Sequence, residues 1–214
     1  NTLRLGLSAV ALSVIVSIPF GIASALYHNR LLDHAGRVFT LLISSFPSFW
    51  VAIVLIIVCG LKLKLLPVGG MQGPESIILP AVTLSMGMTA ATTRMMRSSM
   101  LDVMGQDYIL AAKAKGMKPR KILTRHMLKN ALPPIITVIG LQIGHILGGA
   151  VIIENIFSWP GVGGLLMDAI NAKDTPMIEG CVLLIAFGYT MIHLFVDILY
   201  ACLDPKLKYS GEDS

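Results

Sequence analysis

The chain has 214 residues, of which 55% are hydrophobic and only 14% charged, and its mean hydropathy is +0.76. Soluble domains normally contain about 25% charged residues, so this composition excludes an ordinary soluble domain and predicts a protein embedded in a lipid bilayer. The formal charge of +5 is concentrated in residues 94–130, which is more typical of the orientation signal of a membrane protein than of a nucleic-acid-binding protein.

Five apolar runs follow one another, each near the length of about 20 residues that a helix needs to cross a bilayer. Prolines inside them predict kinked helices, packed as a bundle in which neighbours satisfy the freed carbonyls. The first run begins almost at once after Asn1, with no start methionine, so we expect that an N-terminal part holding one more span is missing. The predicted fold class is an all-α membrane protein, one polytopic helical bundle over 1–214, with spans at 5–27, 38–60, 77–93, 131–153 and 178–203.

The segment 94–130 is the only long polar stretch, and it carries nine Lys or Arg residues against two acids, Asp102 and Asp107. If this segment is cytoplasmic, thirteen basic residues lie on that side and four lie outside. Lys and Arg accumulate in the cytoplasmic connections of membrane proteins. We therefore predict that the 94–130 loop and the C-terminus face the cytoplasm.

Within this loop, Tyr108, Ala111, Ala112 and Lys115 recur at helical spacing, which predicts one helix face with an aromatic ring, two small side chains and a cation. Gly116 follows the last periodic residue and is expected to end the helix in the left-handed conformation. A second helix is expected from Pro119 to about Lys129, because proline suits a first helical turn. The loop is thus predicted to be helix, tight turn, helix.

The fourth predicted span carries Gly140, Gly144 and Gly148 at four-residue spacing. Such a strip lets another helix approach closely, and packing within this chain or against a partner is the interpretation that we favour. A direct role in lining a path is the alternative.

Polar side chains inside predicted spans are costly and therefore informative. A lone membrane His or Gln more often joins two helices by a hydrogen bond than binds a substrate, and none of these residues has metal-site spacing. We expect Asp197, near the cytoplasmic end of the last span, to be neutralised by Arg94 or Arg97. The candidates for a substrate path are Gln142, His145, Glu154, Asn155 and His193.

The connection that follows the fourth span, 154–164, leads into an amphipathic segment, 165–172. Phe157 and Trp159 suit a membrane interface, and Pro160 begins a turn. The segment could be a lid or a connector, and its composition favours the connector.

Four ordered motifs resemble the permease subunits of bacterial ABC importers of the oligopeptide, dipeptide and nickel group, and two shorter stretches resemble the permease of each pair that usually comes first. The resemblance covers essentially the whole chain. Leu110 departs from the Glu that many ABC importers carry before the two alanines, and Gly164 from a common basic residue. The motifs are 107–116 (DYILAAKAKG), 126–133 (HMLKNALP), 154–163 (ENIFSWPGVG) and 196–205 (VDILYACLDP), with 47–50 (PSFW) and 66–69 (LPVG).

The resemblance implies a type I importer permease fold in the bacterial inner membrane. This chain would form half of a translocation path, beside a second homologous permease, two cytoplasmic ATPases and an extracytoplasmic substrate-binding protein. It would hold no catalytic residue, metal or cofactor, because ATP and Mg are bound by the ATPases, and it lacks the phosphate-binding Gly-rich Lys-Ser or Lys-Thr loop. Whether the cargo is a peptide, nickel or a nickel chelate stays open. The ATPase-coupling residues would be Asp107, Tyr108, Ala111, Ala112, Lys115 and Gly116.

Two alternatives are set against this interpretation. One is an intramembrane channel or enzyme that uses His145, Glu154, His193 and Asp197. The other is that the basic loop only rests on anionic headgroups. A channel or enzyme has no need of a basic helical hairpin with a small-residue face, so the loop favours a transporter subunit.

Overall fold

The structure, a computed structural model, describes residues 1–203, without the side chains of residues 145, 147, 197 and 199–203. The predictions that concern His145, Asp197 and the tail after Leu203 therefore lie outside the described part. Residues 1–203 form helices and connections without a strand, as predicted for an all-α chain. The helices are α1 (Thr2–Leu26), α2 (Leu31–Ser45), α3 (Ser48–Leu55), η1 (Ile56–Lys62), η2 (Pro74–Ile77), α4 (Ile78–Met104), α5 (Asp107–Ala114), α6 (Pro119–Lys121), η3 (Ile122–Met127), α7 (Leu128–Ile156), α8 (Val162–Ala172) and α9 (Thr175–Leu203).

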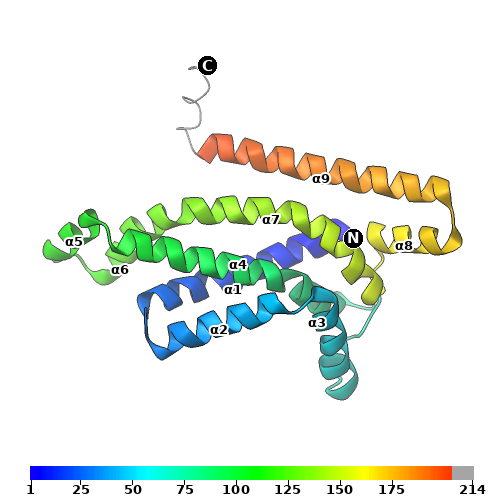
Figure 1. Cartoon of the computed structure of the whole chain (residues 1–214), viewed down its shortest axis with the longest axis horizontal. Coiled ribbons are helices and arrows are strands. Elements are labelled where there is room, and N and C mark those ends of the chain that lie inside the picture. Colours follow the sequence, from blue (N-terminus) through cyan, green and yellow to red (C-terminus); the bar gives the residue numbers. More distant parts are fainter. Residues whose placement is uncertain (204–214) are drawn as a thin grey trace.

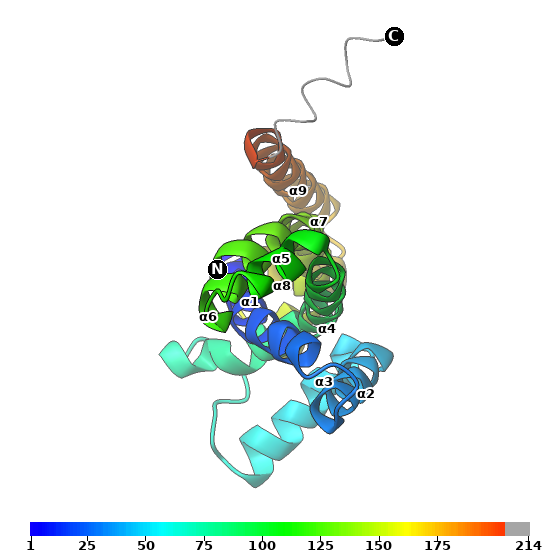
Figure 2. The ribbon, with the colours of Figure 1, turned by 90° about the vertical axis from the view of Figure 1, so that its left-hand side faces the viewer.

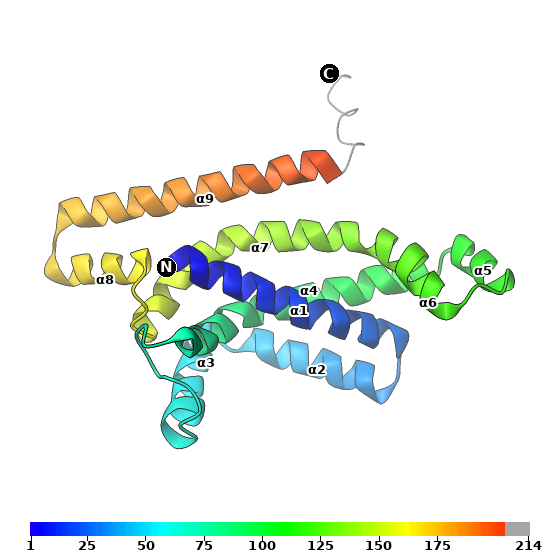
Figure 3. The ribbon, with the colours of Figure 1, turned by 180° about the vertical axis from the view of Figure 1, so that it is seen from behind.

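Helix α4 is the centre of the bundle. It packs along α1 and α7, with α2 on a further side, and Figure 3 shows α1 crossing in front of it. Small side chains of α1 permit the close approach: Gly21 lies so near Met96 that a Cβ there would be 2.6 Å from the Met96 Cβ. The largest apolar cluster joins the ends of α1 and α4 to α5, η3 and α7.

The second predicted span, 38–60, is wrong as a single helix. Helix α2 begins earlier, at Leu31, and the chain then bends by 100° between α2 and the α3–η1 helix. Pro47 explains the position of the bend. A residue before proline is driven out of the helical conformation, and Phe46 has ψ of 134°.

The boundary predicted at Thr93 is also wrong. Helix α4 continues without a break to Met104, so residues 94–104 belong to this helix and not to a loop. The reason lies in the apolar stripe, because Met96, Met100 and Val103 continue the buried face of the helix beyond the basic residues.

The other predicted helices are extended but not rearranged. Consecutive segments α6, η3 and α7 make the chain helical from Pro119 to Ile156, with Pro133 and Pro134 inside α7. Helix α9 lies to one side of the bundle, against α7 and α8, while α2 and α3 lie on the opposite side (Figure 2).

Four helical stretches among the described residues are long and apolar enough to cross a membrane, and the bent α2–α3–η1 pair would make a fifth. Figure 1 shows the four long helices and α2 running broadly side by side, with α3–η1 turned across them, α5 and α6 at one end of the bundle and α8 at the other. The two motif-bearing connections thus lie at opposite ends of the molecule.

Candidate functional site

The basic loop is shorter than predicted because it begins after Met104, but it does form a helix, a tight turn and a second helix. Asp107 lies in the first turn of α5, where a carboxylate opposes the positive end of the helix dipole. Gly116 has φ of +70°, the left-handed conformation predicted from the sequence, and its N–H donates to the Lys113 carbonyl at 2.9 Å. Pro119 begins the next helical segment, as predicted.

Helix α5 has one face in the core and one free. Ile109 is fully buried and Ala112 is 6% exposed, and both belong to the apolar cluster that includes Met100 and Met127. The predicted single face of Tyr108, Ala111, Ala112 and Lys115 is therefore wrong at Ala112. The residue lies three positions after Ile109, so both side chains point into the bundle. The free surface of α5 consists of Asp107, Tyr108, Leu110, Ala111, Lys113, Ala114 and Lys115, hereafter the outer α5 face.

A hydrogen bond joins α5 to α7 through residues of two different motifs. The Asn130 side-chain nitrogen donates to the Tyr108 hydroxyl at 3.0 Å and to the His126 carbonyl at 2.8 Å. This contact and the buried Ile109 and Ala112 hold α5 against the start of α7. The basic loop is consequently packed onto the bundle through α5 and the start of α7.

The predicted glycine strip of α7 does pack within the chain, at one of its positions. A Cβ on Gly144 would overlap the His193 ring of α9, so glycine is what permits this approach. Gly148 has open space instead, because it lines a cavity of about 410 Å³ between α7, α8 and α9, together with Val151, Leu166, Ala186 and Tyr189 among others. Gly140 is buried.

We expect Gly144→Leu to separate α7 from α9 and to lower both the yield and the melting temperature of the purified protein. Gly148→Leu is the matched control, because its side chain can enter the cavity and should leave both quantities close to those of the wild type. Yield and thermal unfolding of the two variants in detergent would be measured side by side. Equal behaviour of the two variants would show that the strip faces lipid.

The residues predicted to line a substrate path do not converge. Gln142 donates to the Thr92 hydroxyl of α4 at 3.4 Å, and Glu154 turns toward α8. The His193 ring contacts that of Tyr189 in the same helix, with centroids 4.3 Å apart and the ring planes tilted by 50°. Asn155 is exposed. Gln142, Glu154 and His193 thus have different neighbours, and the described side chains of this set form no common site.

Glu154 joins the end of α7 to the start of α8. Its carboxylate is fully buried, and Oε2 accepts the N–H groups of Gly163 at 2.8 Å and Gly164 at 3.4 Å, which are unpaired donors of the first helical turn. A Cβ on Gly161 would overlap this carboxylate, and a Cβ on Gly163 would lie 2.8 Å from Oε2. The glycines of this motif therefore make room for the carboxylate.

Two aromatic residues of the same connection are core residues. The sequence predicts that Phe157 and Trp159 suit an interface, which is wrong, because they are 1% and 2% exposed. Trp159 packs with Leu5 of α1, and the Phe157 carbonyl accepts the N–H of Gly70 at 2.8 Å. Large rings close this end of the bundle, which fits a rigid connector better than a mobile lid.

We expect Glu154→Ala to release the first turn of α8 and to destabilise the protein by about 1–2 kcal/mol, the usual effect of losing a helix N-cap contact. Amide hydrogen exchange at Gly163 and Gly164 should accelerate. The exposed Glu179→Ala provides the control and should change neither exchange nor stability. Unaltered exchange at both glycines in Glu154→Ala would contradict the capping role.

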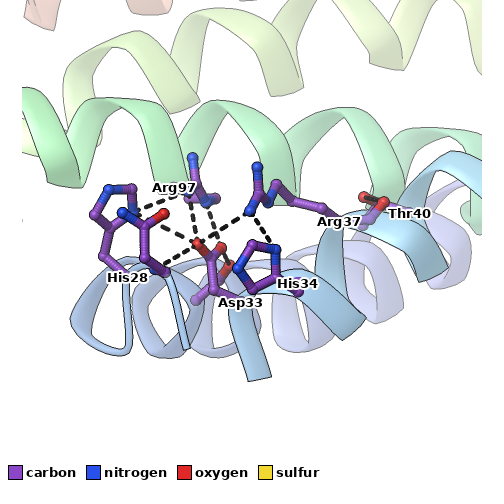
Figure 4. Close-up of polar contacts among 8 residues, drawn as sticks. His28, Asp33, His34, Arg37, Thr40 and Arg97 are labelled. Atoms are coloured by element: carbon purple, nitrogen blue, oxygen red, sulfur yellow. Dashed lines mark hydrogen bonds and ion pairs between the residues drawn. The ribbon is translucent and has the colours of Figure 1, made fainter. Parts of the chain in front are cut away.

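An ion pair not predicted from the sequence holds α2 against α4. Asp33 is fully buried, and Arg97 forms a two-point contact with it, Nε to Oδ1 at 2.6 Å and Nη2 to Oδ2 at 2.8 Å (Figure 4). Ser24 donates to Oδ1 at 2.7 Å, and the Asn29 N–H donates to Oδ2 at 3.0 Å. The carboxylate thus receives four hydrogen bonds from α1, the α1–α2 turn and α4.

Further basic groups surround this pair. The His28 Nδ1 lies 3.5 Å from the Asp33 Oδ2 and the Arg37 Nη2 lies 3.9 Å from it, while Arg37 also contacts His34 (Figure 4). The prediction that Arg94 or Arg97 neutralises Asp197 lies outside the described side chains, and within the described part Arg97 is bound to Asp33. The only sequence signal was a single acid in a short connection flanked by Arg30 and Arg37, and its partner lies 64 residues away.

Comparisons with known proteins agree with the geometry. A family model described as "Binding-protein-dependent transport system inner membrane component" matches residues 17–209. The chain is 36% identical over 208 residues to the glutathione transport system permease protein GsiC of Salmonella typhi, and 40% identical over 220 residues to the oligopeptide transport system permease protein AppB of Bacillus subtilis. These alignments cover 97% and 98% of this chain, and 68% and 69% of the relatives.

Solved structures share the fold. An inward-facing structure of the MetNI methionine ABC transporter superposes with a TM-score of 0.77 at 16% identity, covering 95% of this chain and 93% of that chain. A chain of an amino acid ABC transporter crystallised with histidines superposes with a TM-score of 0.67 at 14% identity, covering 94% and 90%. These likenesses support the predicted type I importer permease fold.

Proposed function

We propose, since this chain belongs to the inner membrane components of binding-protein-dependent transport systems, that it is one permease subunit of an ATP-driven importer of peptides. It would form half of the translocation path, beside a second permease, and work with two ATPases and an external binding protein. The relatives are named for the transport of glutathione and oligopeptides, which favours a peptide over nickel, the other cargo that the resemblance allows.

The observation that carries the coupling role is the outer α5 face. Tyr108 is 43% exposed and Leu110 is 56% exposed, on a short helix at the end of the bundle whose opposite face is anchored in the core. Exposed apolar side chains on a rigid element beyond the spans fit a protein contact. We propose that this face receives the motion of an ATPase subunit, and that Lys115 and Gly116 hold the turn beside it.

The experiment is purification of the intact assembly in mild detergent, identification of its companion chains and reconstitution in proteoliposomes. A second permease and an ATPase should co-purify, and a labelled peptide should accumulate only with ATP and the binding protein. Isolation of a homogeneous complex without an ATPase, or ion flux without ATP, would instead support the channel alternative.

We further propose that the loop containing α5 and α6 is cytoplasmic, on the strength of the basic asymmetry in the sequence. A single cysteine in place of the exposed Lys121, in a cysteine-free background, should resist an impermeant thiol reagent in intact cells and react in inverted vesicles. Labelling in intact cells would show that this loop faces the outside, opposite to the proposed orientation.

A further inference from the structure

Arg94 is a charged residue on the exposed side of α4, inside the stretch Pro74–Met104 that is long and apolar enough to cross a membrane. Its Nη1 donates to the Ser44 hydroxyl of α2 at 3.2 Å. The Ser44 hydroxyl donates in turn to the Thr40 carbonyl at 2.6 Å, which leaves its oxygen free to accept. The guanidinium is therefore held beside the last turn of α2, with most of its donors unused.

The position of Ser44 along α2 gives the depth of this guanidinium. Ser44 follows Asp33 by eleven residues, which is about 16 Å at 1.5 Å per helical residue. Asp33 lies at the end of the span α1, where it bonds to Ser24. With α2 taken to run along the bilayer normal, the Arg94 guanidinium then lies near the middle of a hydrocarbon core about 30 Å thick.

Arg94 has no acidic partner among the side chains that the structure describes, which do not include that of Asp197. The Asp33 carboxylate is already occupied by Arg97, the Ser24 hydroxyl and the Asn29 N–H. An uncompensated guanidinium at mid-depth is too costly to face lipid, and such residues line water-filled paths or bind ligands. The exposed face of α2 and α4 that carries Ser44 and Arg94 therefore requires water, an anion or an acid of a neighbouring chain against it.

We propose that Arg94, supported by Ser44, binds the carboxylate of the peptide during its passage along the wall formed by α2 and α4. The inference rests on the function proposed above. A guanidinium offers a planar pair of donors that matches a carboxylate, and the C-terminal carboxylate of a peptide is ionised at neutral pH. It shifts the substrate path away from Gln142, Glu154 and His193 on α7 and α9.

The first test compares trialanine with trialanine amide in proteoliposomes that contain the complete importer and its binding protein. Because the binding protein is unchanged, any change in the acid-to-amide ratio of uptake rates arises in the permease. We expect Arg94→Gln to slow uptake of the acid about tenfold and to leave uptake of the amide nearly unchanged, since only the acid loses a charge-assisted contact. Arg94→Lys should preserve the ratio. Arg30→Gln, an equal charge change at the exposed start of α2, should alter neither rate.

The possible outcomes separate the alternatives. Equal slowing of both peptides by Arg94→Gln would mean that Arg94 pairs with the second permease, and unchanged uptake would mean that it lies outside the path. Either result overturns the proposal. If the wild-type assembly forms but carries neither peptide, the peptide function fails, and the second test below decides the site on its own.

The second test needs no transport. Cys59, Cys181 and Cys202 are replaced, Ser44→Cys is introduced, and the thiol is treated with an anionic and a cationic methanethiosulfonate of similar size. We expect both reagents to react, with an anionic-to-cationic rate ratio several times higher with Arg94 present than in Arg94→Gln, as Coulomb attraction requires. No reaction with either reagent would place the face against lipid, and an unchanged ratio would show that the Arg94 charge does not act there. Both results refute the site.

Discussion

Ala111→Trp is expected to abolish peptide uptake while the chain still inserts and pairs with its partner permease. Ala111 lies on the outer α5 face, so a bulky ring there obstructs close approach of the ATPase without entering the core. We expect retention of the ATPase on the purified permease to fall at least about tenfold, which corresponds to about 1.4 kcal/mol of binding free energy. Co-purification and ATP hydrolysis stimulated by the loaded binding protein measure this effect.

The neighbouring alanine provides the contrast. Ala112→Trp would force the ring into the apolar cluster around Met100 and Val103, so it should fail by misfolding and not by uncoupling. Ala172→Trp, at an exposed alanine at the end of α8, serves as the inert control. Wild-type ATPase stoichiometry and normal stimulated hydrolysis in Ala111→Trp would show that this loop is not the coupling element. We expect that result if the loop only rests on lipid headgroups, because a Trp strengthens binding to the membrane interface.

Asp33→Ala is expected to lower the free energy of unfolding by about 3 kcal/mol, because removal of one member of a buried ion pair leaves the other charge uncompensated. Arg97 would lose its two-point contact, and the turn between α1 and α2 would lose two further hydrogen bonds. Thermal or denaturant unfolding of the detergent-purified protein measures the loss. Asp102→Ala removes an exposed acid of the same helix as Arg97 and should have little effect.

A double variant distinguishes a lost ion pair from lost packing. Asp33→Leu combined with Arg97→Met removes both charges, and it should recover much of the stability that either single variant loses. Additive losses in the double variant would mean that the two residues act independently. They would contradict the ion-pair explanation.

Hydropathy predicted the helical class and most helix positions, because apolar run length and local chain stiffness are properties of adjacent residues. The order of the motifs carried the family resemblance. The left-handed Gly116 belongs to the same category, since the need for φ above zero arises within one turn. The amphipathic helix α8 was likewise recognisable from its own periodicity. All these features depend on contacts between residues a few positions apart.

Helix boundaries were less predictable where a buried apolar stripe continues between charged residues. Helix α4 runs on to Met104 because its Met and Val side chains remain in the core while its arginines face outward. A hydropathy count averages over both faces and ends the span at the first arginine. The bend at Pro47 was missed for a different reason. The apolar run across it predicts one span, but the proline keeps the preceding residue out of the helical conformation.

The sequence alone determined that this is a helical membrane protein, since that property follows from composition and local pattern, and its motifs carried the resemblance to the permease family. Only the tertiary structure decided which face of α5 is free, that Trp159 is a core residue, and that Asp33 binds Arg97 and leaves Arg94 without an acid among the described residues. The physical reason is the same in each case. A side chain's burial or charge partner depends on which distant helix packs against it, and residues 33 and 97 carry no mutual signal along the chain.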